Sequence, residues 1–227
     1  MNQASKSFWA GVHAEFPLLI GVFPFGLIYG ALALGAGLAP LEAQMMSSIV
    51  FAGSAQFITA QLARDAAPGL IIVLTIAVVN LRHMLYSASI APYIVHLPRH
   101  WKTVLAYLLT DEAYAIAGLH YENHGLTPAG HWFFLGAGLG LWTTWQISCA
   151  LGIFLGAALP PAWPLDFALP LTFIAMVMPV LKDKPMLAAA LSAGAVALLA
   201  QGLPFKLGLI LAALVGIITG TYLEGHR

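Results

Sequence analysis

Long stretches without a charged side chain constrain this chain more than any other feature of its sequence. Asp, Glu, Lys and Arg are absent from eight windows: 16–41, 43–63, 66–81, 83–98, 123–165, 167–181, 185–205 and 207–223. The hydrocarbon core of a bilayer is about 30 Å thick, and a helix needs about 20 mostly apolar residues to cross it. Several windows reach this length, and others reach it when they are joined across one charge. The sequence therefore predicts a polytopic membrane protein.

The composition excludes the main soluble alternatives. Hydrophobic residues make up 60% of the chain and charged residues 8%, whereas a soluble domain is about 45–50% apolar and about 25% charged. So few charges cannot cover so much apolar surface, which excludes a soluble enzyme. Nine Lys and Arg balance nine Asp and Glu, so no positive field is available for nucleic acid. The single cysteine, Cys149, excludes an internal disulfide framework.

The expected fold class is all-α, because the apolar runs are continuous and lack the period-two alternation of barrel strands. We expect a polytopic integral membrane helix bundle with broken helices and seven or eight spans, forming one transmembrane transporter domain over 1–227. The predicted spans lie near 16–38, 41–63, 69–95, 104–120, 132–158, 167–181, 186–201 and 205–223. For 69–95, a re-entrant hairpin is the alternative to a single span.

Glycine pairs four residues apart lie on one face of several expected helices. These pairs are Gly26/Gly30, Gly136/Gly140, Gly152/Gly156 and Gly216/Gly220. Small residues let helix backbones approach closely in lipid. The pairs predict close helix contacts, either within the chain or with a partner.

Three polar clusters interrupt the apolar segments, and the first lies in the middle of the second predicted span. Gly53 and Ser54 have little bulk and weak helical preference. Gln56 carries a polar amide that has no obvious reason to lie in lipid. Together they favour a local unwinding whose backbone groups line a cavity, with a half-helix N-terminus facing an anionic substrate group. A tight helix crossing, with Gln56 hydrogen-bonded to a neighbour, explains the same residues.

The second cluster begins at Asn80 and contains Arg82 and His83, with apolar runs on both sides. An ionisable residue at this depth costs about 2.5–3.5 kcal/mol and needs a partner or a water-filled cavity. The guanidinium of Arg82 can hold the carboxylate of an amino-acid-like substrate or of a fixed acid. His83 can titrate near neutral pH. Both residues also fit a role as helix caps at an interface.

The third cluster places two acids side by side, Asp111 and Glu112. Adjacent residues point about 100° apart on a helix, so both acids cannot face lipid cheaply. Asp111 is the expected counter-charge of Arg82, and Glu112 is expected to face a lumen or an interface. A buried acid beside a pore is the usual proton relay. A purely structural ion pair between Arg82 and Asp111 is the alternative.

The three clusters also carry a family resemblance. The segments FAGSAQF (51–57), NLRHMLYS (80–87) and LTDEAY (109–114) occur in this order. The ordered set resembles the AzlC-type family, the large subunit of bacterial branched-chain amino acid exporters. The similarity covers most of the chain and is strongest in its N-terminal half. It implies a multi-pass protein of the bacterial inner membrane that exports valine, leucine or isoleucine, with a small hydrophobic AzlD-type partner subunit.

The sequence thus predicts secondary-active export of small apolar amino acids. The candidates for substrate binding are Gly53, Ser54, Gln56, Asn80 and Arg82, and those for ion or proton coupling are Asp111, Glu112 and His83. Apolar neighbours, namely Phe51, Phe57 and Leu85, are candidates for a pocket that holds a branched side chain.

No catalytic or cofactor motif supports another activity. The chain lacks a G-x-x-x-x-G-K-[ST] phosphate loop, an H-E-x-x-H zinc motif and a G-x-S-x-G nucleophile motif. We therefore expect no cofactor, no metal and no enzymatic activity. A membrane-embedded hydrolase and a passive channel remain the alternative functions.

Overall fold

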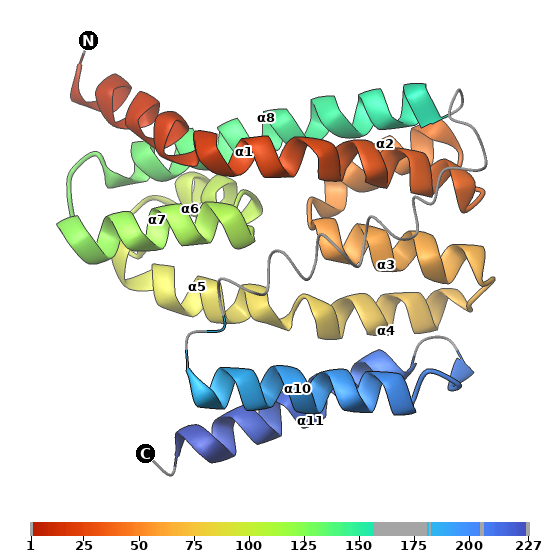
Figure 1. The fold of residues 1–227 in the computed structure, drawn as a ribbon. Coiled ribbons are helices and arrows are strands. Elements are labelled where there is room, and N and C mark those ends of the chain that lie inside the picture. Colours follow the sequence, from red (N-terminus) through yellow and green to blue (C-terminus); the bar gives the residue numbers. More distant parts are fainter. Residues whose placement is uncertain (1, 157–180, 182, 205–206, 226–227) are drawn as a thin grey trace. The chain divides into compact units, whose positions relative to one another are not determined.

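The computed structural model describes residues 2–156, 181, 183–204 and 207–225, and no strand occurs among them. In chain order its helices are α1 (Gln3–Gly35), α2 (Pro40–Val50), α3 (Gly53–Arg64), α4 (Gly69–Val79), α5 (Leu81–Ile94), α6 (Arg99–Tyr107), α7 (Asp111–His124), α8 (Gly130–Gly156), α10 (Lys184–Leu199) and α11 (Leu207–Glu224) (Figure 1). The predicted all-α class is confirmed.

Within the described residues, four helical stretches are long and apolar enough to cross a membrane. They are α1, the stretch Gly69–Ile94 formed by α4 and α5, α8 and α11. Helix α10 is a shorter apolar helix. The stretch Gly69–Ile94 is 26 residues long, which favours a single span for this segment over a re-entrant hairpin.

The chain divides into two compact units. The first unit contains Met1–Ala60 and Val79–Trp163, and the second contains Gln61–Val78 and Pro164–Arg227. All eight candidate site residues belong to the first unit. The single transporter domain expected over 1–227 stays a prediction.

Helices α1 and α8 lie side by side and form the frame of the first unit (Figure 1). They run in the same direction, because Gly11 faces Phe133 near one end of the pair and Gly30 faces Ile153 near the other. The two backbones touch where glycines remove the side chain, as the glycine pairs predict. A Cβ on Gly152 would lie 2.2 Å from the carbonyl oxygen of Leu27.

Helices α2 and α3 form a hairpin that reverses direction inside the unit. Tyr29 of α1 donates a hydrogen bond to the Ala43 carbonyl in α2 at 2.9 Å and packs its ring against Phe57 in α3. The chain therefore passes Tyr29 twice, once on the way in and once on the way out. Between these points it turns at Phe51, which has the left-handed backbone angle φ 42°.

Helices α6 and α7 form a second hairpin. Trp101 in α6 packs on Trp132, and Tyr121 in α7 lies against Gly130, so both helices have an end near the start of α8. The turn between them lies further along α8, against Gly138. The chain again enters the unit and leaves on the side from which it came.

These hairpins correct two of the predicted spans. The sequence predicts a single crossing over 41–63, with a break near Gly53, and another over 104–120; in the structure each segment turns back on itself instead of crossing once. Each segment contains two helices of 9 to 14 residues, shorter than the roughly 20 residues that a crossing needs. The count of seven or eight spans treated both segments as crossings. The predicted span 167–181 lies, apart from residue 181, outside the described residues.

The two hairpins enter the first unit from opposite ends (Figure 1). Helix α5 runs parallel to α7, because Tyr86 stacks on Tyr114 and Tyr93 stacks on Tyr121. Helix α7 runs antiparallel to α8 and hence to α1. A helix followed by a hairpin thus occurs twice with opposite directions, first with α1 and then with α5. Inverted repeats around a central site are common in secondary transporters.

The second unit has a simpler described part. Helices α10 and α11 are antiparallel and touch through small residues, since Gly208 faces Ala200 while Gly216 faces Ala189 and Ala193. The Gly216/Gly220 pair of the sequence lies in this contact, with Gly220 also against Ala189.

The contact between α1 and α8 can be tested with one methyl group. We expect Gly152→Ala to lower the unfolding temperature in detergent, because its Cβ would meet the backbone of Leu27 and such overpacking costs about 1–3 kcal/mol. Gly21→Ala is the matched control, since none of the described atoms lies within 4 Å of its Cβ position. Equal unfolding temperatures for both variants would contradict the close approach.

Candidate functional site

Each of the three polar clusters lies where a helix begins after a break. Helix α3 begins at Gly53, α5 begins directly after Asn80, and α7 begins at Asp111. The first turn of a helix has unpaired N–H groups and a partial positive charge. The sequence placed an unwound segment near Gly53, and the structure has the break directly before it, at Phe51 and Ala52.

Side chains from other helices stabilise the break in the first hairpin. Because α2 ends at Val50, carbonyls in its last turn need partners other than the next helical turn. Tyr107, at the end of α6, donates its hydroxyl to the carbonyl of Ser48. Gln146 of α8 donates to the carbonyl of Ser47 at 3.1 Å. The turns of the two hairpins are thereby joined midway along α8.

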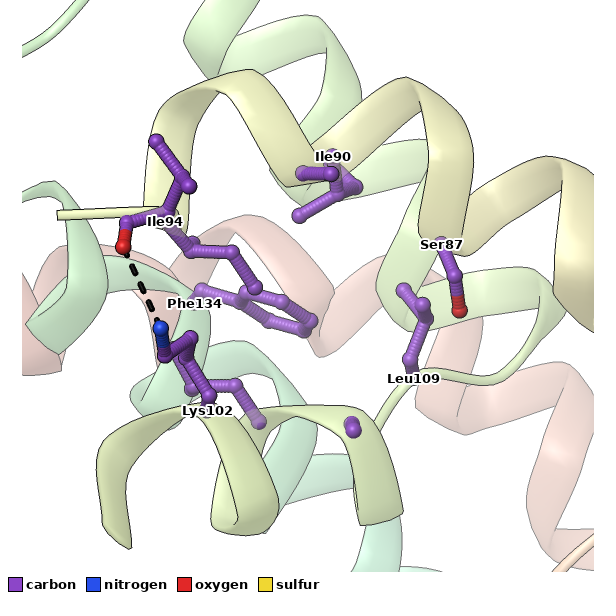
Figure 2. Close-up of a pocket in the computed structure, with 10 residues that line it drawn as sticks. Ser87, Ile90, Ile94, Lys102, Leu109 and Phe134 are labelled. Atoms are coloured by element: carbon purple, nitrogen blue, oxygen red, sulfur yellow. Dashed lines mark hydrogen bonds between the residues drawn. The ribbon is translucent and has the colours of Figure 1, made fainter. Parts of the chain in front are cut away.

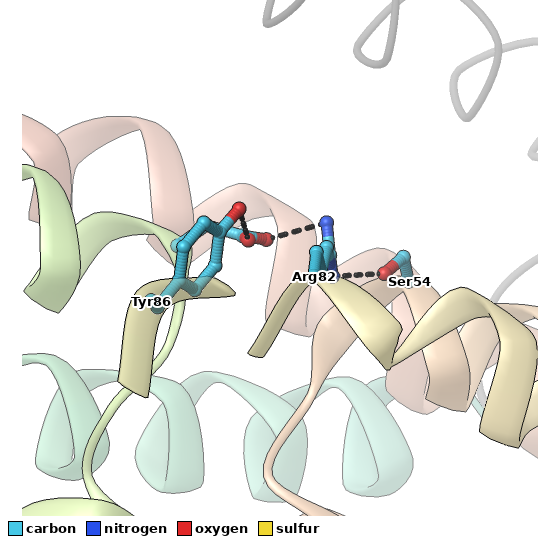
Figure 3. Close-up of polar contacts among 4 residues, drawn as sticks. Ser54, Arg82 and Tyr86 are labelled. Atoms are coloured by element: carbon cyan, nitrogen blue, oxygen red, sulfur yellow. Dashed lines mark hydrogen bonds and ion pairs between the residues drawn. The ribbon is translucent and has the colours of Figure 1, made fainter. Parts of the chain in front are cut away.

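An ion pair lies at this meeting point (Figure 3). Arg82 Nη1 is 2.8 Å from Asp111 Oδ2, which is the pairing that the sequence predicts. The other terminal nitrogen of Arg82 donates to Ser54 Oγ. Tyr86, one turn after Arg82, donates its hydroxyl to Asp111 Oδ1 at 2.8 Å. All three predicted clusters thus contribute to a single network, the second with both Arg82 and Tyr86.

The ion pair is within reach of a small molecule. The side chains of Arg82 and Asp111 keep 31% and 26% of their surface accessible. Three polar atoms of this region have no hydrogen-bond partner among the described residues: Arg82 Nε, Asn80 Oδ1 and His83 Nε2. The His83 ring packs edge-on against Tyr86.

Two of the predicted binding residues face α8 instead of the ion pair. Gly53 packs against Trp145, whose ring would lie 3.2 Å from a Cβ at this position. Gln56 is fully buried, and its Oε1 accepts a hydrogen bond from Trp145 Nε1 at 3.1 Å. This is the contact expected from the helix-crossing alternative for Gln56. Gly53 reaches the ion pair only through its neighbour Ser54.

An acid that the sequence did not single out lies inside α1. Glu15 of α1 is fully buried, and its charge interacts with that of Glu112. The span predicted at 16–38 begins one residue after Glu15, which left this residue at the membrane edge. In the structure α1 begins at Gln3, so Glu15 lies well inside it.

The apolar residues expected to form a side-chain pocket do not do so. Phe57 is buried against α1, and Phe51 packs on Tyr107. Leu85 is 72% exposed. An expectation based on proximity in sequence to the polar clusters fails here, because neighbouring helical positions face different directions.

A cavity of about 250 Å³ lies nearby, between α5, α6 and α8 (Figure 2). Its walls are mainly apolar and include Ile90, Ile94, Leu105, Leu109 and Phe134. Lys102 stands at one side and donates to the carbonyl of Val95 at 3.2 Å. Ser87 and Leu109 line the cavity directly after Tyr86 and two residues before Asp111. The cavity therefore adjoins the ion-pair network.

No group of three or more His, Cys, Asp or Glu side chains suited to a metal ion occurs in the part of the chain that the structure describes. The arrangement instead consists of one cation, one anion and two hydroxyls. Such a set binds charged and hydrogen-bonding groups of either sign.

Comparison with known proteins agrees with this picture. The model of the AzlC protein family matches residues 17–159, which include all three broken-helix clusters. The chain belongs to the AzlC family.

It is 30% identical to the inner membrane protein YgaZ of Escherichia coli over 95% of this chain and 89% of YgaZ. It is 32% identical to an uncharacterized membrane protein of Archaeoglobus fulgidus over 95% of this chain and 96% of that protein. No solved structure matches the chain. Family membership supports a membrane protein with a transport role.

The ion pair can be tested by a double-mutant cycle. Arg82→Gln and Asp111→Asn should each lower the unfolding temperature, because each leaves one charge without its partner. The double variant should recover part of the loss, with a coupling energy of about 0.5–3 kcal/mol. The measurement is the unfolding transition of all four proteins in detergent. Strictly additive losses would show that the pair does not form in the folded protein.

Proposed function

We propose that this chain is the large subunit of a secondary-active exporter of branched-chain amino acids in the bacterial inner membrane. The observation that carries the proposal is the accessible Arg82–Asp111 pair at the point where two inverted hairpins meet. The E. coli relative is named an inner membrane protein, which supports the location. A small hydrophobic AzlD-type subunit is the proposed partner.

A pair of opposite charges suits a zwitterion. An amino acid has one carboxylate and one ammonium group, so it can exchange partners with the pair and leave no charge uncompensated. In this scheme the Arg82 guanidinium takes the substrate carboxylate, helped by Ser54 Oγ and the N-terminus of α3. Asp111 takes the ammonium, while Tyr86 holds the aspartate in place.

The neighbouring cavity fits an aliphatic side chain. A volume of about 250 Å³ with walls of Ile90, Leu105 and Phe134 offers apolar contacts and few polar ones. A methylene in such a pocket contributes only about 1–3 kcal/mol of discrimination, so we propose a preference among valine, leucine and isoleucine and no absolute specificity. Export against a concentration gradient needs a coupled ion, for which Asp111, Glu112 and His83 are the proposed residues.

Arg82→Lys tests the proposed carboxylate site. Lysine keeps the positive charge but loses the planar fork that reaches both Asp111 and Ser54. A hydrogen bond to a charged group is worth about 1.5–3 kcal/mol, so efflux should fall about tenfold or more. The measurement is efflux of radiolabelled valine from loaded cells at matched protein levels.

Arg99→Lys is the matched control, because Arg99 is exposed at the start of α6. It should export valine at the wild-type rate. Wild-type efflux by Arg82→Lys would remove Arg82 from the site. Efflux that never proceeds against a gradient would indicate a channel, and chemical change of the label would indicate an enzyme.

Ala106→Phe tests the cavity, because a phenyl group at this lining position would fill part of its volume. Leucine export should fall more than valine export, since leucine has the longer side chain. Ala115→Phe is the control, on an exposed position of α7 outside the cavity. The leucine-to-valine export ratio is the measurement, and an unchanged ratio in Ala106→Phe would exclude this cavity as the side-chain pocket.

A further inference from the structure

Glu15 is a buried ionisable residue whose carboxyl group lacks a hydrogen-bond partner in the part of the chain that the structure describes. It lies inside α1, is fully buried, and neither of its carboxyl oxygens has a hydrogen-bond partner among the described residues. A buried carboxylate without a donor or a cation is costly to keep as an anion. The proposed substrate site, centred on Arg82, does not use it.

The charged group that acts on Glu15 belongs to another acid. Helix α1 packs on α8, α7 and α2, and the carboxyl group of Glu112 in α7 interacts electrostatically with Glu15. The ionisable residues of α8 are His131 and Cys149, near its start and beyond its middle, and that of α2 is Glu42, in its first turn. Cys149 lies against Gly26, and Glu42 adjoins Ala43, which contacts Tyr29, so both lie about three turns or more beyond Glu15 along α1.

The nearby cation is already used. Arg82 pairs with Asp111 at 2.8 Å, and that aspartate also accepts a hydrogen bond from Tyr86. The charge of Arg82 acts on Glu112 as well, so Asp111, Glu112 and Glu15 are three acids with one cation among them. The two acids in excess become electrically neutral only by taking up protons or a cation, and the absence of a third ligand group among the described residues argues against a metal ion.

We propose that Glu15 and Glu112 form a proton-binding site that couples export to the proton gradient. The proposal rests on the proposed function and adds to it the coupling ion and a coupling residue, Glu15. Glu112 directly follows Asp111 at the start of α7, so the proton site and the substrate site share one helix end. Protons bind from the outside and leave to the inside, while the amino acid moves outward.

The test separates exchange from coupled transport in liposomes that contain the full chain together with its proposed small partner subunit. Counterflow of labelled against unlabelled valine at equal pH needs no net proton movement, whereas accumulation of valine in liposomes with an acidic interior requires proton exit. Glu15→Gln should keep counterflow near the wild-type rate and lose accumulation. Glu15→Asp, which retains a carboxyl group, should recover accumulation in part.

Glu122→Gln is the matched control, because Glu122 is an exposed residue on the same helix as Glu112. It should keep both activities. Glu112→Gln should behave like Glu15→Gln, and it provides the test if Glu15→Gln does not yield a monodisperse protein in detergent.

Two results would overturn the coupling proposal. Accumulation by Glu15→Gln at the wild-type level would show that Glu15 carries no coupled proton. Loss of counterflow together with accumulation, in a folded variant, would make Glu15 a substrate ligand instead.

Failure of the proposed function gives a different pattern, in which the wild type itself shows no counterflow of any branched-chain amino acid. Proton binding can still be measured in that case. Infrared difference spectra between acidic and alkaline pH should contain a protonated-carboxyl band that is absent in Glu15→Gln. An identical band in both proteins would exclude proton binding by Glu15.

Discussion

The need to satisfy backbone polar groups away from water governs the centre of this protein. A helix that ends inside a membrane has free carbonyls and N–H groups, and lipid offers them no partner. Helices α2, α4 and α6 end at Val50, Val79 and Tyr107, just before the helices that carry the three polar clusters. Tyr107 and Gln146 donate to carbonyls in the last turn of α2, and the glycine-mediated contact of α1 and α8 provides the rigid frame against which both turns pack.

The same breaks produce the polar site. A helix that restarts at the centre places its first residues, and the partial positive charge of its N-terminus, at that depth. Asp111 lies in the first turn of α7, where this charge stabilises a carboxylate, and Ser54 lies in the first turn of α3. Arg82 bridges them. An accessible ion pair at the meeting point of inverted hairpins is the structural basis for the proposed binding of a zwitterion.

The correct and the wrong predictions from the sequence have different physical causes. Pairing of Arg82 with Asp111 could be predicted, because an arginine between apolar runs needs a counter-charge and few acids are available. The hairpins could not, since hydropathy counts apolar residues and does not record chain direction. Glu15 was missed because its charge defined the edge of an apolar window. Gln56 was assigned to the substrate site on its polarity alone, and its partner, Trp145, lies 89 residues away in the chain.

The sequence by itself determined that the chain is helical and lies in a membrane, and it marked the break near Gly53 and the positions of the three polar clusters. These properties follow from local composition: continuous apolar runs, scarce charges, and Gly, Ser and Asp at the restarts. Only the tertiary structure decided that two segments reverse direction, which polar residues meet, and that Glu15 is buried among packed helices. These properties depend on contacts between residues far apart in the chain, because each side chain on a helix points to one neighbour and the packing of the helices selects which one it is.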